Sequence, residues 1–513
     1  MRAPTTSLRR WLGPVLLVLV AFVFRSAYYT ENYGHPDEAI TFEVVRYMRA
    51  SGDWDSNWAK AKLEPAFHYE QYNFASYLHA TFGFYRFVKG ISTLDEWRAR
   101  DGGFWVYRFF SVLLATLAVM QTWWLARTIG GVRVGLAAGL LAAVLPGLVQ
   151  DAHYARPEAF LTVLTLTAVL LSLPRGMFSA WRVFGAAAVV GLSVACKISM
   201  LALAWLPLVA LMPIERGVTV GLGRWSWAVG LTLTGLIVGF AAGAPDAMLH
   251  MQTYGHGVLY LSQQYAGLHP PHSPLIDKTA TGLLTGYYLS TLGGLGLVAA
   301  LGGSVALWRQ PRKRECMILM GPLVLFAGYF CTRSVFFERN LSHVLPLGCV
   351  LTALGLVAGA KWIERRAGVC AAWGLAALLA LALARPTDLS MRLIKEFSRE
   401  PAKKRAVQIA ELRQAHPGLV WREIDLLSSS PLEDLRQHFK DAGGALLVRV
   451  LDYHDEWSSY HGALLQTQFE AKLIATVPSV FADVGSCTLH TYSSWTDRFY
   501  LVTGVLKGAG AGK

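Results

Sequence analysis

Two adjacent carboxylates, Asp37 and Glu38, stand in the stretch YGHPDEAITFEVVRYM, directly after an apolar run. Pro36 suits the first turn of a helix, where the helix dipole favours acidic side chains. Apolar residues follow at helical spacing over residues 40 to 48, as a stripe that can lie along a membrane surface. The pair is therefore either a structural feature of a helix start or a proton acceptor in catalysis, and the spacing leaves both readings open.

Three other short segments contain charged side chains, among them the cations that could pair with these carboxylates. DAHYARPE supplies Asp151, His153, Arg156 and Glu158, GLSVACKISM supplies Lys197, and TRSVFFERNLSHVLP supplies Arg333, Arg339 and His343. A charge at membrane depth is costly, so it is usually paired or faces a polar cavity. Each cation alone could also be an interfacial anchor, a reading that is strongest for Arg333.

Together these side chains suit the transfer of a group from a lipid phosphate. A phosphate leaving group needs little protonation, but its developing charge needs Arg or Lys held in place. The hydroxyl that accepts the group must lose its proton, which calls for a carboxylate base. We therefore expect phosphate-binding cations beside an acidic base at one membrane surface.

The elements that position these residues are predicted to be membrane helices. The chain has 513 residues, is 54% hydrophobic with a mean hydropathy of +0.37, and is only 16% charged. Because a helix needs roughly 20 apolar residues to cross a bilayer, we predict a polytopic α-helical membrane protein with about eleven transmembrane helices. The predicted spans are 12–29, 104–127, 132–150, 157–173, 183–196, 198–213, 226–245, 281–307, 316–332, 342–360 and 367–384. The two short runs that meet at Lys197 would also fit a single re-entrant segment.

Basic residues gather in alternate connections between these spans, such as RQPRKR at 309 to 314 and KWIERR at 361 to 366. The positive-inside rule places such loops in the cytoplasm. The loops at 30–103 and 246–280 and the turns at 151–158 and 333–341 then lie on the far side. The net charge of +13 thus reflects the basic cytoplasmic loops of a membrane protein, and no nucleic acid partner is expected. We predict an inner (cytoplasmic) membrane protein whose site faces the periplasmic, or extracytoplasmic, side.

Two domains are predicted. Residues 1–385 form the transmembrane domain with its large first loop, and residues 386–513 form a soluble domain on the non-cytoplasmic side. The soluble domain is predicted to be α+β, because apparent helices at 402–415 and 431–442 alternate with strand-like runs such as ALLVRV at 445–450.

No cofactor is firmly expected. The six cysteines show no CxxC or paired spacing, so neither a disulfide framework nor a thiolate metal site is indicated. The loop at 246–280 contains His250, His256, His269 and His272 without the tight spacing of a structural metal site. A divalent metal is the alternative left open.

Four motifs, in their order along the chain, resemble those of the polytopic C-type (GT-C) glycosyltransferases of family 39. They are HPDEA, HYARPEAFLT, GLSVACKISM and RNLSHVLPLGCVLTALG. The family includes protein O-mannosyltransferases and bacterial aminoarabinose transferases, and the resemblance covers roughly residues 10 to 385. It implies a polyprenyl-phosphate-linked sugar as donor, inversion at the anomeric carbon, contact with membrane lipid, and a glycan, lipid or protein as acceptor.

The resemblance also implies roles for individual residues. The expected site consists of Asp37 as base with Glu38 beside it, donor-phosphate contacts from Arg156, Lys197, Arg339 and His343, and acceptor or orienting contacts from His153 and Glu158. Two positions depart from the family pattern: Asn340 follows Arg339 where Tyr is usual, and His343 stands where an apolar residue is common.

The competing class is a polytopic lipid or sugar transporter, or flippase. Transporters commonly show inverted repeats with broken helices in matching halves. This chain instead has one large first loop and a large terminal domain on the same side. We therefore predict an inverting glycosyltransferase, with a ligase that moves a preassembled glycan as a further alternative.

Overall fold

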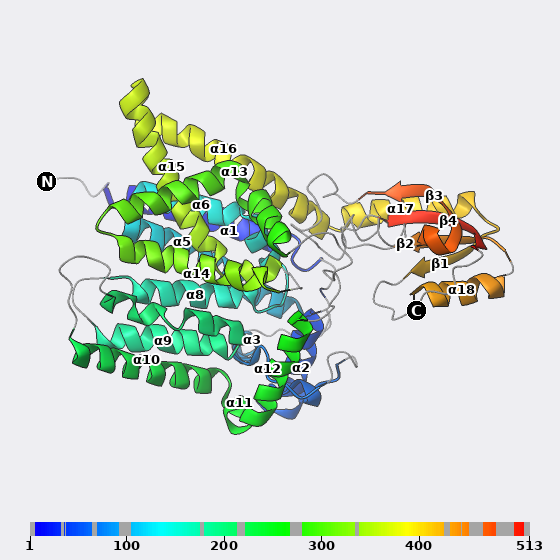
Figure 1. Cartoon of the computed structure of the whole chain (residues 1–513), viewed down its shortest axis with the longest axis horizontal. Coiled ribbons are helices and arrows are strands. Elements are labelled where there is room, and N and C mark those ends of the chain that lie inside the picture. The colour runs from blue at the N-terminus through cyan, green and yellow to red at the C-terminus, as the bar shows by residue number, and fades with distance from the viewer. Residues whose placement is uncertain are drawn as a thin grey trace.

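The computed structural model places apolar helices side by side in one bundle, with a small sheet domain at one end (Figure 1). It describes residues 6–31, 35, 37–63, 69–91, 104–174, 179–212, 221–266, 280–333, 338–424, 431–442, 444–450, 465–478 and 497–506. His269, His272 and Cys487 lie outside these ranges.

The bundle is built from helices that are apolar over most of their length. These are α1 (Thr6–Ser26), α5 (Phe104–Gly130), α6 (Val132–Val144), α7 (Pro146–Ala152), α8 (Glu158–Ser172), α9 (Ala180–Val194), η3 (Ile198–Leu203), η4 (Leu206–Leu211), α10 (Leu222–Gly243), α13 (Ala280–Arg309), α14 (Lys313–Cys331), α15 (Leu345–Ala367) and α16 (Ala371–Phe397). Every predicted span coincides with one or more of them.

Six helical segments of the described chain are long and apolar enough to cross a membrane, and the bent pair α6 and α7 makes a seventh if it is one span. Four shorter apolar segments lie in α1, α8, α9 and the η3–η4 region. The chain is therefore a polytopic helical membrane protein, as predicted. The number of eleven crossings stays a prediction.

Three predicted spans are less regular than expected. The span at 132–150 bends by 59° between α6 and α7, because Pro146 lacks an N–H and starts a new helix. Gly293 interrupts α13 with a φ of 70°, a conformation that glycine adopts readily. In the span predicted at 198–213, residues 198–203 and 206–211 form two short 3₁₀ segments instead of an α-helix.

The predicted far-side loops contain helices of their own. The first loop holds α2 (Glu38–Ser51), η1 (Trp58–Lys60) and α3 (Ala75–Ile91), and the loop after α10 holds α11 (Pro245–Leu249) and α12 (Met251–Ala266). The apolar stripe of α2 does not lie on the membrane surface. Val44 and Met48 are fully buried in a cluster with Leu78 of α3 and Tyr107 of α5, because these two helices cover the stripe.

The C-terminal domain is a small α+β unit, as predicted. It contains α17 (Glu400–Ala415), β1 (Val420–Ile424), α18 (Pro431–Ala442), β2 (Leu446–Val450), β3 (Phe469–Val477) and β4 (Asp497–Val505). The strands form one sheet in the order β1-β2-β4-β3, in which only the β1 and β2 pair is parallel. Side chains from α18 and β2 to β4, such as Leu435, Val448 and Tyr500, form its apolar core.

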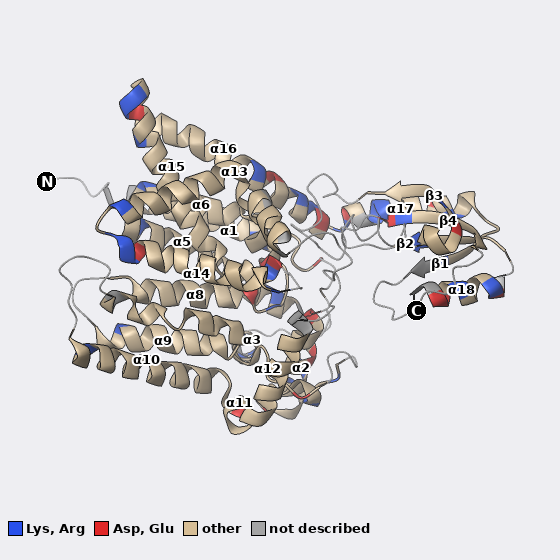
Figure 2. Cartoon of the chain, viewed as in Figure 1, with Lys and Arg blue, Asp and Glu red and all other residues tan. Residues whose placement is uncertain are grey.

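Basic side chains mark one end of the bundle. Figure 2 shows Lys and Arg at the ends of α5, α13, α14 and α15, on the side away from the sheet domain. The turn between α7 and α8 and the start of α2 lie toward the opposite end (Figure 1). The charged residues of those two segments therefore face away from the basic loops.

Candidate active site

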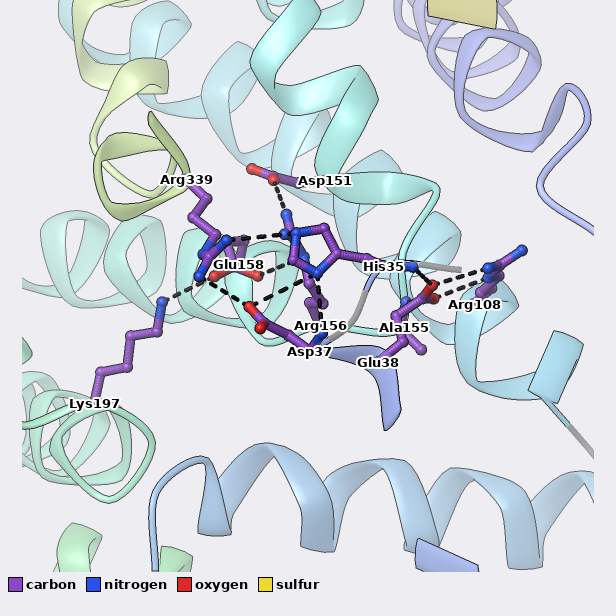
Figure 3. Close-up of polar contacts among 10 residues, drawn as sticks. All are labelled: His35, Asp37, Glu38, Arg108, Asp151, Ala155, Arg156, Glu158, Lys197 and Arg339. Carbon is purple, nitrogen blue, oxygen red and sulfur yellow. Dashed lines mark hydrogen bonds and ion pairs between the residues drawn. The ribbon is translucent and has the colours of Figure 1, made fainter. Parts of the chain in front are cut away.

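Four segments that are distant in the sequence bring charged side chains together (Figure 3). Asp37 and Glu38 come from the start of α2, Arg156 and Glu158 from the turn before α8 and its first residue, Lys197 from the turn before η3, and Arg339 from η5 (Glu338–Leu341). The structure thus gathers most of the residues that the sequence singled out. It also divides them into parts with different surroundings.

Asp37 faces a cation instead of capping its own helix. It occupies the N-cap position of α2, but its side chain makes no capping hydrogen bond. Its Oδ2 lies 2.9 Å from Nη2 of Arg339. The backbone N–H of Asp37 donates to Nδ1 of His35 at 3.1 Å, and Nε2 of the same ring lies 3.4 Å from Nη1 of Arg339. A role as a helix cap therefore does not account for this carboxylate.

Asp151, Arg156 and Glu158 form a buried layer behind this contact. Nη2 of Arg156 donates to Oδ1 of Asp151 at 3.1 Å, and Nε of Arg156 lies 3.4 Å from Oε2 of Glu158. The side chains of Arg156 and Glu158 are each only 3% exposed. Burial disfavours the charge of Arg156, but the neighbouring carboxylates of Glu158 and Asp151 raise its pKa above the ordinary value. The guanidinium therefore stays charged.

Asp37, Lys197 and Arg339 form the accessible edge of the site. Their side chains are 21%, 18% and 19% exposed, respectively. Nζ of Lys197 donates to Oε1 of Glu158 at 2.8 Å, so the buried layer holds this ammonium in place. The edge and the layer together thus contain three carboxyl groups and three basic groups that contact one another. An incoming phosphate would have to compete with Asp37 for Arg339.

Glu38 has a structural environment, unlike its neighbour. Its carboxylate accepts two hydrogen bonds from Arg108 of α5, at 2.9 and 2.8 Å, and one from the N–H of Ala155 at 2.6 Å. Glu38 and Arg108 are each 1% exposed. The predicted carboxylate pair is therefore split, with Glu38 tying α2 to α5 and to the turn that carries Arg156. Sequence reasoning missed Arg108, although a single Arg near the start of an apolar span is a recognisable signal.

Replacing Glu38 by Gln tests this structural assignment. We expect the free energy of unfolding to fall by about 1–3 kcal/mol, because a buried charge-assisted contact to Arg108 is lost. Turnover should stay well above that of Asp37→Asn. Glu43→Gln on the same helix is the control, since Glu43 pairs with the half-exposed Arg46 and such pairs contribute little. Thermal unfolding and turnover of both variants check the prediction, and a Glu38→Gln protein that is stable but inactive would contradict it.

The two histidines of the expected site are buried. His153 lies 2.7 Å through Nδ1 from the carbonyl oxygen of Val149 and 2.8 Å through Nε2 from that of Ala27. Its ring thus joins the end of α7 to the segment after α1 and does not reach the accessible edge. His343 packs edge-on against Phe326, with ring centroids 4.4 Å apart, and its Nε2 has no hydrogen-bond partner among the described residues.

The described residues contain no group of three or more His, Cys, Asp or Glu side chains that could hold a metal ion. His250 stacks on Tyr72, with ring centroids 6.4 Å apart. Since His269 and His272 lie outside the described ranges, the alternative of a divalent metal on this loop is not tested by the described residues.

Comparison with known proteins places the fold. No protein-family model matches the chain, and no curated protein matches it by sequence. ArnT from Cupriavidus metallidurans in the apo state is structurally similar, with a TM-score of 0.55, 13% identity, and coverage of 99% of this chain and 100% of ArnT. ArnT bound to undecaprenyl phosphate has a TM-score of 0.51, 14% identity, and coverage of 97% and 99%.

A second similar structure is the oligosaccharyltransferase of Archaeoglobus fulgidus in its apo form. Its TM-score is 0.50 at 13% identity, with 77% of this chain and 57% of the other chain covered. At these identities the likeness concerns the fold. The chain therefore has the GT-C glycosyltransferase fold, as predicted, while membership of family 39 stays a prediction.

Proposed function

We propose that the chain is an inverting glycosyltransferase that moves a sugar from a polyprenyl-phosphate donor to an acceptor hydroxyl. The observation that carries the proposal is the accessible edge, where Oδ2 of Asp37 lies 2.9 Å from Nη2 of Arg339. A carboxylate and positioned cations are what this transfer needs, and here they occur on a GT-C fold. The structurally similar ArnT binds undecaprenyl phosphate, which supports a donor of this class.

The cations would hold the donor phosphate. Arg339 and Lys197 are the accessible ones, and the guanidinium of Arg339 can offer two parallel hydrogen bonds to phosphate oxygens. Arg156 adds positive charge from behind, where water is excluded and electrostatic attraction is stronger. When the phosphate takes over Arg339, the carboxylate of Asp37 loses its ion-pair partner and becomes available to an acceptor hydroxyl.

The transfer step then has one base and one leaving group. The acceptor oxygen forms a bond to the anomeric carbon on the face opposite the phosphate, and the bond from that carbon to the phosphate oxygen breaks. The hydroxyl proton passes to the carboxylate of Asp37. The polyprenyl phosphate leaves, and the cations of Arg339 and Lys197 stabilise the negative charge on its oxygens. Attack from the opposite face inverts the anomeric configuration.

The proposal also assigns the accessible edge to one side of the membrane. The basic ends of α5, α13, α14 and α15 lie at one end of the bundle (Figure 2), and the positive-inside rule assigns that end to the cytoplasm. The accessible edge would then face the periplasmic or extracytoplasmic side of the inner membrane. The C-terminal domain would lie on the same side, near the acceptor.

Mass spectrometry of cells with and without the gene tests this function. We expect loss of the gene to remove one sugar from an envelope glycan, lipid or protein and to cause a polyprenyl-phosphate-linked sugar to accumulate. Complementation with wild type should reverse both changes, and complementation with Asp37→Asn should reverse neither. Identical lipid-linked sugars and envelope glycans in the two strains would contradict the proposal.

A further inference from the structure

The far end of α16 packs against the turn that carries Arg156. Leu389, Leu393 and Phe397 form one buried cluster with Tyr154, which lies between α7 and α8. Figure 1 shows α16 running out of the bundle toward the sheet domain, and α17 of that domain begins at Glu400. The helix that leads into the C-terminal domain therefore touches the candidate site.

Phe397 is the centre of this contact. Its side chain is fully buried. Its ring stacks on His153, with centroids 4.1 Å apart and an interplanar angle of 24°, and stands edge-on to Tyr154 at 5.9 Å and 89°. Stacked and edge-on pairs at these distances are favourable and have defined geometry. Phe397 thus fixes both aromatic residues of the turn.

Tyr154 links Phe397 to the charged residues of the site. The guanidinium carbon of Arg156 lies 5.0 Å from the centroid of the Tyr154 ring, within the range of a cation–π interaction. The ring of His35 stands edge-on to the same ring at 5.4 Å. Arg156, with a side chain only 3% exposed, therefore has an aromatic support as well as its carboxylate partners.

A second contact of α16 is made by Ser390. Oγ of Ser390 donates to the carbonyl oxygen of Val144 at 2.8 Å, at the break between α6 and α7. The last carbonyls of a helix lack partners within the helix, so this bond holds the position where the chain turns. The helix that follows the break carries Asp151, which accepts a hydrogen bond from Arg156.

We infer that Phe397 is a positioning residue for the lipid-phosphate site, acting through Tyr154 and His153 on Arg156. The inference rests on the proposed function, because it assigns Arg156 to a bound phosphate. Since α17 follows Phe397 after two residues, a displacement of the C-terminal domain would reach Arg156 through the same helix end.

Binding of a sugar-free polyprenyl phosphate to the purified full-length protein tests the inference without requiring catalysis. We expect Phe397→Ala to weaken binding by roughly 3- to 30-fold, the range for residues that act on a site through packed neighbours. Phe397→Leu should recover part of the loss because it keeps apolar volume. Met391→Ala is the control, since Met391 lies on the same helix and is 52% exposed.

A double-mutant comparison separates positioning from a general loss of structure. If Phe397 acts through Arg156, Phe397→Ala combined with Arg156→Ala should bind no more weakly than Arg156→Ala alone. The inference would be overturned if the double variant lost affinity by the product of the two single losses. It would also be overturned if Phe397→Ala bound like the wild type while Arg156→Ala bound weakly. Either result would leave the proposed function intact. Wild-type binding by Arg156→Ala would instead reject the phosphate role of Arg156, and the inference with it. If Phe397→Ala does not fold, Phe397→Leu takes its place in the comparison.

Discussion

Asp37→Asn should lower the turnover of a polyprenyl-phosphate sugar by roughly 100- to 10,000-fold, the usual range for loss of a general base. The substitution keeps the shape and polarity of the side chain but removes the proton acceptor. Donor binding should survive, because Arg339 and Lys197 remain. Turnover and donor affinity of the purified variant, measured side by side, check the prediction.

If Asp37 only caps the helix, a different stability and turnover are expected for the same variant. Asn is a good residue at the start of a helix, so a structural role would cost well under about 2 kcal/mol in stability and leave turnover nearly intact. The absence of a side-chain capping bond at Asp37 already argues against that role. Near wild-type turnover of Asp37→Asn would reject the carboxylate base and restore the capping interpretation.

Arg339→Ala should slow turnover by roughly 30- to 1,000-fold, since a positioned charge-assisted contact contributes about 2–4 kcal/mol to a transition state. The Arg339→Lys variant should recover only part of the lost turnover, because an ammonium group cannot donate two parallel hydrogen bonds to a phosphate as a guanidinium does. The effect should appear with a saturating donor as well, since the negative charge on the phosphate grows as the bond breaks.

Arg333→Ala is the matched control for this experiment. Its guanidinium carbon lies 4.5 Å from the centroid of the Tyr329 ring, as expected of an interfacial anchor, so turnover should hardly change. Steady-state kinetics of Arg339→Ala, Arg339→Lys and Arg333→Ala check the prediction. Equal losses at positions 339 and 333 would mean that these residues act only as membrane anchors.

The sequence was sufficient to predict the membrane bundle, because long apolar runs and basic connections act locally. It was also sufficient to single out Asp37, Arg156, Lys197 and Arg339, since charges beside apolar spans are rare and need partners. The spacing of the residues did not distinguish Asp37 from Glu38, and only the family resemblance assigned the base to Asp37. The structure gives the two carboxylates different environments. That difference arises from Arg108, which is 70 residues away from Glu38 along the chain.

Other features could not be predicted because they depend on packing between distant helices. The stripe of α2 has the pattern of a surface helix, and only the presence of α3 and α5 over it decides that Val44 is buried. His153 is expected from the sequence to contact or orient the acceptor, yet Phe397 of the distant helix α16 covers its ring. The residues from 198 to 213 are apolar enough for a helix, but apolar periodicity does not distinguish 3₁₀ from α geometry.

The most direct test is a reaction of the purified protein in lipid nanodiscs with polyprenyl-phosphate sugars and envelope-derived acceptors. Our account predicts that polyprenyl phosphate is released in step with sugar transfer and that the product has the inverted anomeric configuration. The Asp37→Asn variant should neither release polyprenyl phosphate nor transfer the sugar. Reconstitution of the protein in vesicles tests for transport of the donor instead. Movement of the intact donor across the bilayer without cleavage of its sugar–phosphate bond would contradict the account and identify a transporter.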